Sequence, residues 1–279
     1  MLHILTFGSD PERFQHLKNT EKLFNAHIHY LTCDFYEAFI SKLVAVMEYI
    51  MNPEIPNDDI ICFIDGYDVL MNSSIEEIME KFLAKGADLV FSAEMNFCGG
   101  SEDGIQRKIY DIIHAGFPTN FKYINAGGYI GYKHTVAKFL NWQPYEDIRK
   151  LCVDLGDQAY CHYYFLHNII KYKDAESIAV DYQCDIFQSM YLVDWNEVGF
   201  CDGRFFNKVL EIKPCFIHFN GSSYQYMDGR KNDSNIMPVF VEKMIQSAQN
   251  KDTVFDLRDY EPSKYKHRNY GMSQLSAKK

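Results

Sequence analysis

One segment of nine residues constrains this chain more than any other part of it. Residues 60–68 read IICFIDGYD, an apolar run that ends in two carboxylates, Asp65 and Asp68, with Tyr67 between them. Such a run is typical of a strand buried on both faces of a parallel sheet. Ligands of open α/β sheets bind beyond the carboxyl ends of the strands, where these acids fall. Paired carboxylates suit Mg²⁺ or Mn²⁺, so the segment predicts an enzyme that holds a nucleotide diphosphate through a metal.

Strand-like and helix-like segments alternate along the chain. Strands are expected at 2–7, 26–31, 60–64, 89–92 and 215–218, and helices at 11–24, 40–51, 75–85, 105–115, 158–170 and 239–248. Asp10 and Ser74 stand where two of these helices begin, and their side-chain oxygens suit the free N–H groups of a first turn. The alternation predicts an α/β fold with a mostly parallel, doubly wound sheet flanked by helices. We expect one domain over residues 1–250 and a polar tail over 251–279.

Composition narrows the classes of partner. The formal net charge of −10 argues against nucleic acid, because phosphate backbones need a basic face. No apolar run reaches the length that spans a membrane, and the N-terminus lacks the cationic start of a secretory signal, so a cytoplasmic location is the default expectation. The eight cysteines form no CxxC pair, which favours reduced thiols over a disulfide framework.

Two further polar signals accompany buried runs. Asn125 precedes the pair Gly127 and Gly128, and glycines let a backbone approach a ligand closely. His218 ends an apolar run. An imidazole beside two carboxylates favours Mn²⁺ over Ca²⁺. From spacing alone, however, a histidine at a strand end is more often structural, so both interpretations stay open.

Five motifs in order resemble a known family. They are FIDGYDV at 63–69, FSAE at 91–94, YINAGGYIG at 123–131, DQ at 157–158 and IHFNG at 217–221. Together they resemble the glycosyltransferase domain of the multifunctional procollagen lysyl hydroxylases and the related collagen glycosyltransferases. The resemblance covers about residues 6–221. It implies a GT-A fold, Mn²⁺ as cofactor and UDP-glucose as donor, with glucose transferred to galactosyl-hydroxylysine of a collagen-like polypeptide.

The resemblance also implies a role for each matching residue. Asp65, Asp68 and His218 would bind Mn²⁺, and Tyr67 would stack on uracil. The rest of the nucleotide would contact Phe7, Ser9, Lys42, Asn220 and Gly221. The donor sugar and the acceptor would face Glu94, Asn125, Asp157 and Gln158. The alternative for Asp157 is an ordinary helix cap, and the alternative for Lys42 is a solvated position near the start of a helix.

Two other functions stay open on the sequence. The same family transfers galactose from UDP-galactose directly to hydroxylysine, and no residue here distinguishes the two sugars. Gly99 and Gly100 stand where the family has a tryptophan and a proline, which leaves room for a UDP-sugar-binding module without activity. The oligomeric state, a homodimer included, is not readable from the sequence.

Overall fold

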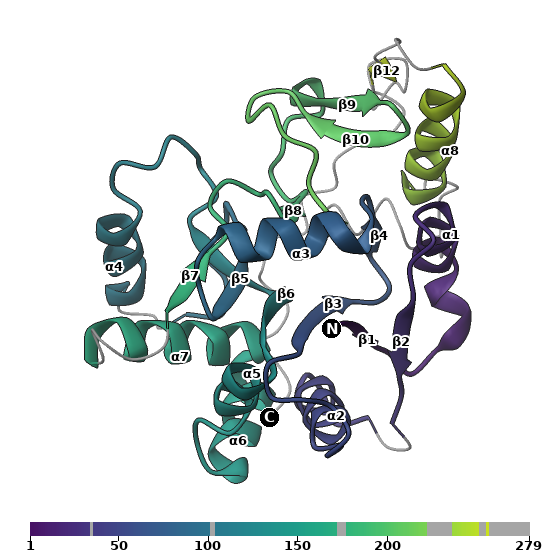
Figure 1. Ribbon diagram of the computed structural model, residues 1–279. Coiled ribbons are helices and arrows are strands. Elements are labelled where there is room, and N and C mark those ends of the chain that lie inside the picture. Colours follow the sequence, from purple (N-terminus) through teal and green to yellow (C-terminus); the bar gives the residue numbers. More distant parts are fainter. Residues whose placement is uncertain (34–35, 101–103, 172–176, 222–235, 251–254, 257–279) are drawn as a thin grey trace, which may run out of the picture.

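Strands and helices alternate along most of the chain (Figure 1). The structure is a computed structural model, and it describes residues 1–33, 36–100, 104–171, 177–221, 236–250 and 255–256. In chain order the elements are β1 (Leu2–Phe7), the 3₁₀ turn η1 (Pro11–Phe14), α1 (Gln15–Leu23), β2 (Ile28–Leu31), α2 (Ile40–Ile50), β3 (Ile60–Asp65), β4 (Val69–Met71), α3 (Ile75–Ala84), β5 (Leu89–Glu94), α4 (Ile105–Ile113), β6 (Tyr123–Tyr132), α5 (Lys133–Leu140), α6 (Tyr145–Leu155), α7 (Asp157–Lys171), β7 (Ile178–Val180), β8 (Phe187–Ser189), the 3₁₀ turn η2 (Trp195–Glu197), β9 (Val198–Cys201), β10 (Arg204–Asn207), β11 (Phe216–His218), α8 (Ile236–Gln249) and β12 (Phe255–Asp256).

A six-stranded sheet in the order β2-β1-β3-β6-β5-β7 forms the centre of the molecule (Figure 1). β1 pairs in parallel with β2 and β3, and β7 pairs in parallel with β5. β6 runs antiparallel to both of its neighbours, β3 and β5. The mostly parallel α/β sheet is therefore confirmed, with β6 as the one reversed strand of this sheet.

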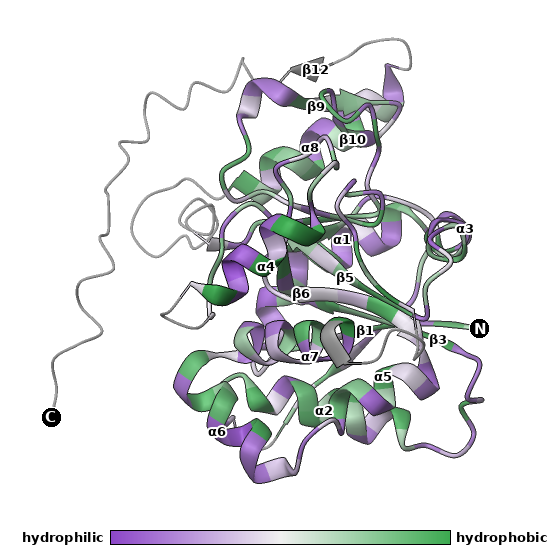
Figure 2. Ribbon diagram, turned by 90° about the vertical axis from the view of Figure 1, so that its left-hand side faces the viewer, coloured by the Kyte–Doolittle hydropathy of each residue, from purple (hydrophilic) through white to green (hydrophobic). Residues whose placement is uncertain are grey.

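Helices lie on both sides of the sheet, as Figure 2 shows. On one side α2, α5 and α7 cover it, and Leu43, Val136 and Phe165 from these helices belong to one buried cluster. Leu17 of α1 and Phe82 of α3 belong to a second buried cluster with strand residues. Burial on both faces explains why strand β3 is apolar at every position before its terminal acid.

The predicted helix starts are confirmed at both capping residues. The Asp10 carboxylate accepts a hydrogen bond from the amide of Glu12, and Ser74 Oγ accepts one from the amide of Glu77. The first helix differs from the prediction because residues 11–14 form a 3₁₀ turn before α1 begins. Pro11 suits that first turn because its missing N–H would have no partner there.

Two small sheets complete the fold, and of their strands the sequence pattern indicated β11 alone. β4, β11 and β8 form one, in which β11 is antiparallel to β4 and parallel to β8. β10, β9 and β12 form the other. β12 lies within the segment expected as a polar tail, and it pairs with β9; residues 251–254 and 257–279 lie outside the described part of the chain.

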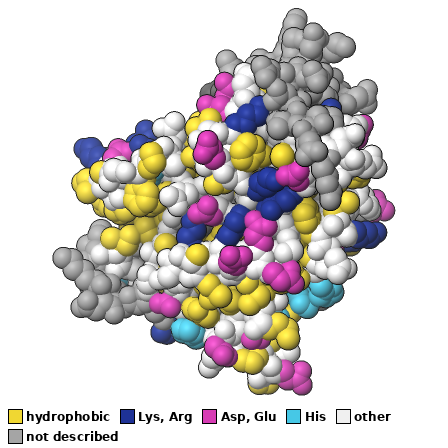
Figure 3. Space-filling view, turned by 45° about the horizontal axis from the view of Figure 1, so that its top comes forward, with side chains coloured by type: hydrophobic (Ala, Val, Ile, Leu, Met, Phe, Trp, Pro, Cys, Tyr) yellow, Lys and Arg dark blue, Asp and Glu magenta, His cyan; other side chains and the backbone are white. Residues whose placement is uncertain are grey.

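The surface and the cysteines agree with an ordinary folded domain. On the face drawn in Figure 3, Lys and Arg side chains lie intermixed with Asp and Glu side chains, so the visible side chains form no field of one sign. All eight cysteines are free thiols. None of the helices in the described residues has the length and apolarity needed to cross a bilayer.

Candidate active site

Asp65, Asp68 and His218 come together at the carboxyl end of β3. The pairing of β11 with β4 sets His218 opposite Val69, directly beside the Asp68 side chain. His218 Nε2 lies 3.3 Å from Asp68 Oδ2 and 3.7 Å from Asp65 Oδ2. One ligand atom from each residue fits within 4.8 Å of the others, a spacing that suits one metal ion. This geometry supports a role for His218 as a metal ligand, beside its structural role at the end of β11.

A glycine makes room for these three side chains. A Cβ atom on Gly127 would lie 2.2 Å from His218 Cε1 and 2.7 Å from Asp65 Oδ2, far inside contact distance. Gly127 lies within the ten-residue strand β6, and its missing side chain accommodates protein groups. That its backbone also approaches a ligand stays a prediction.

Asn125 fixes which nitrogen of His218 faces the acids. Asn125 Oδ1 lies 3.0 Å from His218 Nδ1 and also accepts the amide N–H of Gly127. An amide oxygen can only accept, so Nδ1 carries a proton and Nε2 is the nitrogen that faces Asp65 and Asp68, available to a metal when the ring is neutral. Burial lowers the pKa of His218, but the carboxylates of Asp68 and Asp65 outweigh burial, and the net shift is upward.

Lys42 is buried beside the acids. Its ammonium group lies 3.0 Å from Asp65 Oδ1 and also forms an ion pair with Asp157, the first residue of α7. Burial disfavours the charged amine, yet the two carboxylates hold the pKa of Lys42 above its usual range. The interpretation of Lys42 as a solvated residue is wrong, because only 7% of it is exposed. Asp65 therefore faces a cation through one oxygen and His218 through the other.

Three amide side chains donate hydrogen bonds to the buried carboxylate of Glu94. Its carboxylate accepts hydrogen bonds from Gln158, from Asn220 at 2.8 Å and from Asn125 at 3.4 Å. Burial raises the pKa of Glu94, and these hydrogen bonds act against that shift. Asn220 Oδ1 in turn accepts from Ser189 Oγ, at 2.7 Å. The Glu94 cluster, defined as Glu94, Asn125, Gln158 and Asn220, thus connects β5, β6, α7 and the segment after β11.

Aromatic side chains line the approach from β1. The Tyr67 hydroxyl accepts the amide N–H of Asp10 at 2.7 Å, and the Arg13 guanidinium lies 4.0 Å from the Tyr67 ring centre. Phe7, which ends β1, stacks on Tyr36 with ring centres 6.4 Å apart. Tyr36 is 52% exposed, and its pKa is raised by burial and by the nearby carboxylates of Asp157 and Asp65. The sequence pattern does not indicate a role for Tyr36, because this residue lies in an irregular segment.

The two remaining predicted positions lie at the margins of the site. Ser9 is exposed in the turn after β1. Gly221 follows β11 with φ of +63°, and a Cβ there would meet the Tyr191 ring at 2.8 Å. Tyr191 also donates its amide to Asn220, so this ring and this amide hold the backbone after His218 in place.

The donor set fits a hard or borderline divalent cation. Two carboxylate oxygens and one imidazole are ligands for Mn²⁺ and related ions, and Asp65 is open enough for an ion to enter, with 31% of its side chain exposed. A bound divalent ion would supply positive charge for a diphosphate. Beside it, Lys42 and Asp157 provide a fixed cation and a carboxylate.

The chain is similar to known proteins over much of its length. The profile of the family described as the PLOD GT domain matches residues 41–235. The uncharacterized protein R699 of Acanthamoeba polyphaga mimivirus is 27% identical over 225 residues, which cover 80% of this chain and 42% of that protein. The human multifunctional procollagen lysine hydroxylase and glycosyltransferase LH3 is 29% identical over 172 residues, covering 59% of this chain and 21% of that protein. This chain thus spans less than half the length of either relative.

The apo structure of the bifunctional glycosyltransferase WbbM aligns with a TM-score of 0.43 and 10% identity, over 90% of this chain and 52% of that chain.

Proposed function

The chain belongs to the PLOD GT domain family, and from this premise we propose that it is a Mn²⁺-dependent glucosyltransferase. The proposed reaction moves glucose from UDP-glucose to galactosyl-hydroxylysine of a collagen-like polypeptide. The name of the human relative, which joins procollagen lysine hydroxylase and glycosyltransferase, supports this acceptor. We further propose residues 1–250 as the transferase domain.

One observation carries the proposal: a metal-ligand set and a buried Lys–Asp pair share the Asp65 carboxylate at the carboxyl edge of the sheet. Asp65 contacts Lys42 through Oδ1 and lies near His218 through Oδ2. A diphosphate leaving group needs positive charge where its negative charge develops. Lys42 and a metal at Asp65 would supply that charge from two sides.

The proposed transfer assigns distinct work to the two buried acids. The bond between the sugar C1 and the diphosphate oxygen breaks, a bond from C1 to the acceptor hydroxyl oxygen forms, and the hydroxyl proton passes to the departing diphosphate. Asp157 would stabilise the oxocarbenium-like charge on the sugar, because its carboxylate lies beside the same Lys42. Glu94 would orient Asn125, Gln158 and Asn220, since both of its oxygens already accept hydrogen bonds from them.

UDP release tests this function. The wild-type chain is assayed with Mn²⁺ and either UDP-glucose or UDP-galactose, with and without a galactosyl-hydroxylysine peptide. We expect release from UDP-glucose that rises with the peptide and stops with EDTA. Asp65→Asn should abolish release, while Asp58→Asn, an exposed acid on the loop before β3, should leave it unchanged.

The other outcomes separate the rival functions. Release only from UDP-galactose with unglycosylated hydroxylysine would replace glucose by galactose in the proposal. UDP binding without release from either donor would indicate a binding module. Full activity of Asp65→Asn would contradict the metal assignment itself.

A further inference from the structure

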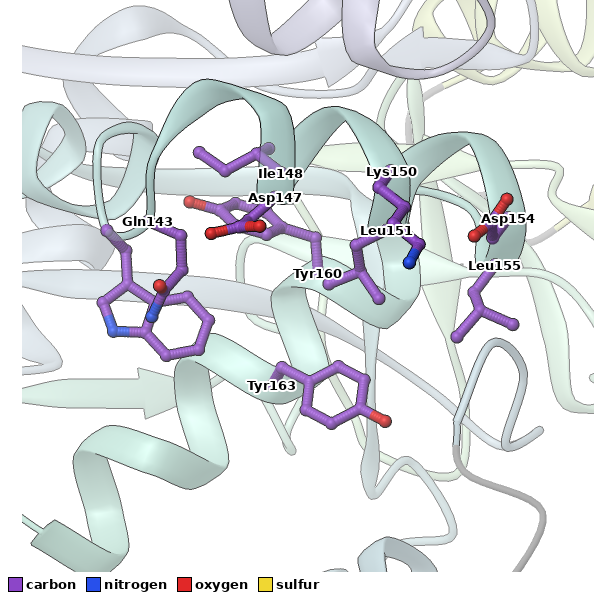
Figure 4. Close-up of a pocket in the computed structure, with 10 residues that line it drawn as sticks. Gln143, Asp147, Ile148, Lys150, Leu151, Asp154, Leu155, Tyr160 and Tyr163 are labelled. Carbon is purple, nitrogen blue, oxygen red and sulfur yellow. The ribbon is translucent and has the colours of Figure 1, made fainter.

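A groove lies between α6 and α7, and none of the residues that line it belongs to the metal-ligand set (Figure 4). Its volume is about 360 Å³. In Figure 4 the side chains of Leu151 and Leu155 on α6 point toward Tyr163 on α7. Trp142, two residues after the end of α5, and the buried ring of Tyr160 complete the apolar lining. Leu155 is 48% exposed, so apolar surface stays open to solvent here.

The groove offers hydrogen-bond donors and acids as well as apolar surface. Within the described residues, the Trp142 indole N–H and the Tyr163 hydroxyl have no hydrogen-bond partner. The Lys150 ammonium lies on the same lining. Asp147 and Asp154 stand at the exposed rim, and the whole chain carries a net charge of −10. A partner that fits must therefore bring apolar rings, free acceptors and basic side chains.

The groove leads to the candidate active site. Leu155 lines one end of it, and only Gly156 separates Leu155 from Asp157. Two residues of chain span at most about 7 Å, so this end of the groove lies close to the Lys42–Asp157 pair. Gly156, with φ of +88°, turns the chain sharply between the two helices. A polypeptide lying in the groove would reach the carboxyl edge of the sheet.

We propose that the groove binds the acceptor polypeptide as an extended, proline-rich strand with basic side chains; this inference rests on the proposed function. In the polyproline II conformation, backbone carbonyls have no internal partners, and proline rings pack against aromatic side chains. Trp142 and Tyr163 supply both the rings and the donors, and Asp147 and Asp154 face the basic side chains. The eleven residues of α6 extend about 16 Å, which about five residues of such a strand would match.

Direct binding tests the groove apart from catalysis. A fluorescent (Gly-Pro-Lys)-repeat peptide without sugar is titrated against the wild-type chain, against Leu155→Ser/Tyr163→Ala and against Leu83→Ser. Leu83 is the matched control, because it is a 54% exposed leucine on the distant helix α3. We expect the double variant to weaken binding about tenfold, the loss that two half-buried contacts would produce. Leu83→Ser should bind like wild type.

Transfer assays then separate this inference from the proposed function. With free galactosyl-hydroxylysine as acceptor, the double variant should keep the wild-type KM and kcat, while its KM for a long glycosylated peptide rises. No peptide binding by the wild type, or equal binding by the double variant, would overturn the groove proposal. If the wild type is a dimer in light scattering and the double variant is a monomer that still binds the peptide, the groove proposal would also be overturned, and the groove would be a surface for self-association. A wild type that binds peptide but transfers no sugar would contradict the proposed function alone.

Discussion

Replacing Gly127 by alanine tests the metal site through a single methyl group. In an ordinary strand this change would stabilise the fold by roughly 0.5–1 kcal/mol, because glycine loses more backbone freedom on folding. Here the new Cβ would lie 2.2 Å from His218 Cε1 and 2.7 Å from Asp65 Oδ2. Carbon atoms need about 3.5 Å, so the imidazole must move by more than about 1 Å. Two of the three ligand residues are displaced at once.

The expected loss is therefore one of metal affinity. Displacing groups that orient metal ligands costs typically about 10–100-fold in affinity, or about 1.4–2.7 kcal/mol. We expect the Mn²⁺ concentration for half-maximal UDP release from Gly127→Ala to rise by about that factor. Binding of Mn²⁺ measured by electron paramagnetic resonance should show the same shift without any donor. Thermal unfolding of the metal-free variant checks that the fold survives.

The neighbouring glycine supplies the control. A Cβ on Gly128 would meet Phe187 Cδ1 at 2.8 Å, a contact in the apolar core. Gly128→Ala should lose about 1–3 kcal/mol of stability through overpacking and keep its Mn²⁺ affinity. The reasoning fails if Gly127→Ala binds Mn²⁺ within about twofold of wild type, or if both variants lose affinity equally.

Two further variants probe buried charge. Lys42→Met leaves the carboxylates of Asp65 and Asp157 without their cation, so the free energy of unfolding should fall by about 3 kcal/mol in guanidinium titrations without metal, whereas Lys42→Arg should lose less. His162 is fully buried, and burial lowers its pKa to about 4. The unfolded chain takes up this proton near pH 6.5 and the folded chain only near pH 4, so stability should fall by about 3 kcal/mol as the pH drops through that window. Urea titrations at pH 7 and pH 5 would measure how the free energy of unfolding changes with pH, and this change should be smaller in His162→Gln. An equal change in wild type and variant would assign the acid sensitivity to other groups.

The sequence predicted the elements whose signal is local. The strand at β3 follows from an unbroken apolar run, and the caps at Asp10 and Ser74 follow from side chains that act within three residues. Strand β6 escaped the pattern because its glycines are typical of loops. It is a strand because β3 and β5 bind it on both sides, and those partners are distant along the chain.

The site shows the same division between local and distant information. Asp65 and Asp68 were predicted as ligands from one segment, whereas His218 reaches them through the pairing of two three-residue strands, β4 and β11. Three residues are too few to show the alternation of apolar and polar side chains by which a strand is recognised in a sequence. The inward ion pairs of Lys42 depend on α2 and α7 packing on one face of the sheet, which no spacing along the chain encodes.

The Glu94 cluster has a consequence for how this site can change in evolution. A carboxylate only accepts, so Glu94 forces the NH₂ group of each surrounding amide toward itself and commits each amide oxygen to another task. Asn125 Oδ1 serves His218, and Asn220 Oδ1 serves Ser189. Exchanging Glu94 for glutamine would set one NH₂ group against another and reverse that polarity. Related chains that differ at position 94 should therefore carry compensating differences at positions 125, 158 and 220, so these four positions would be inherited as one unit.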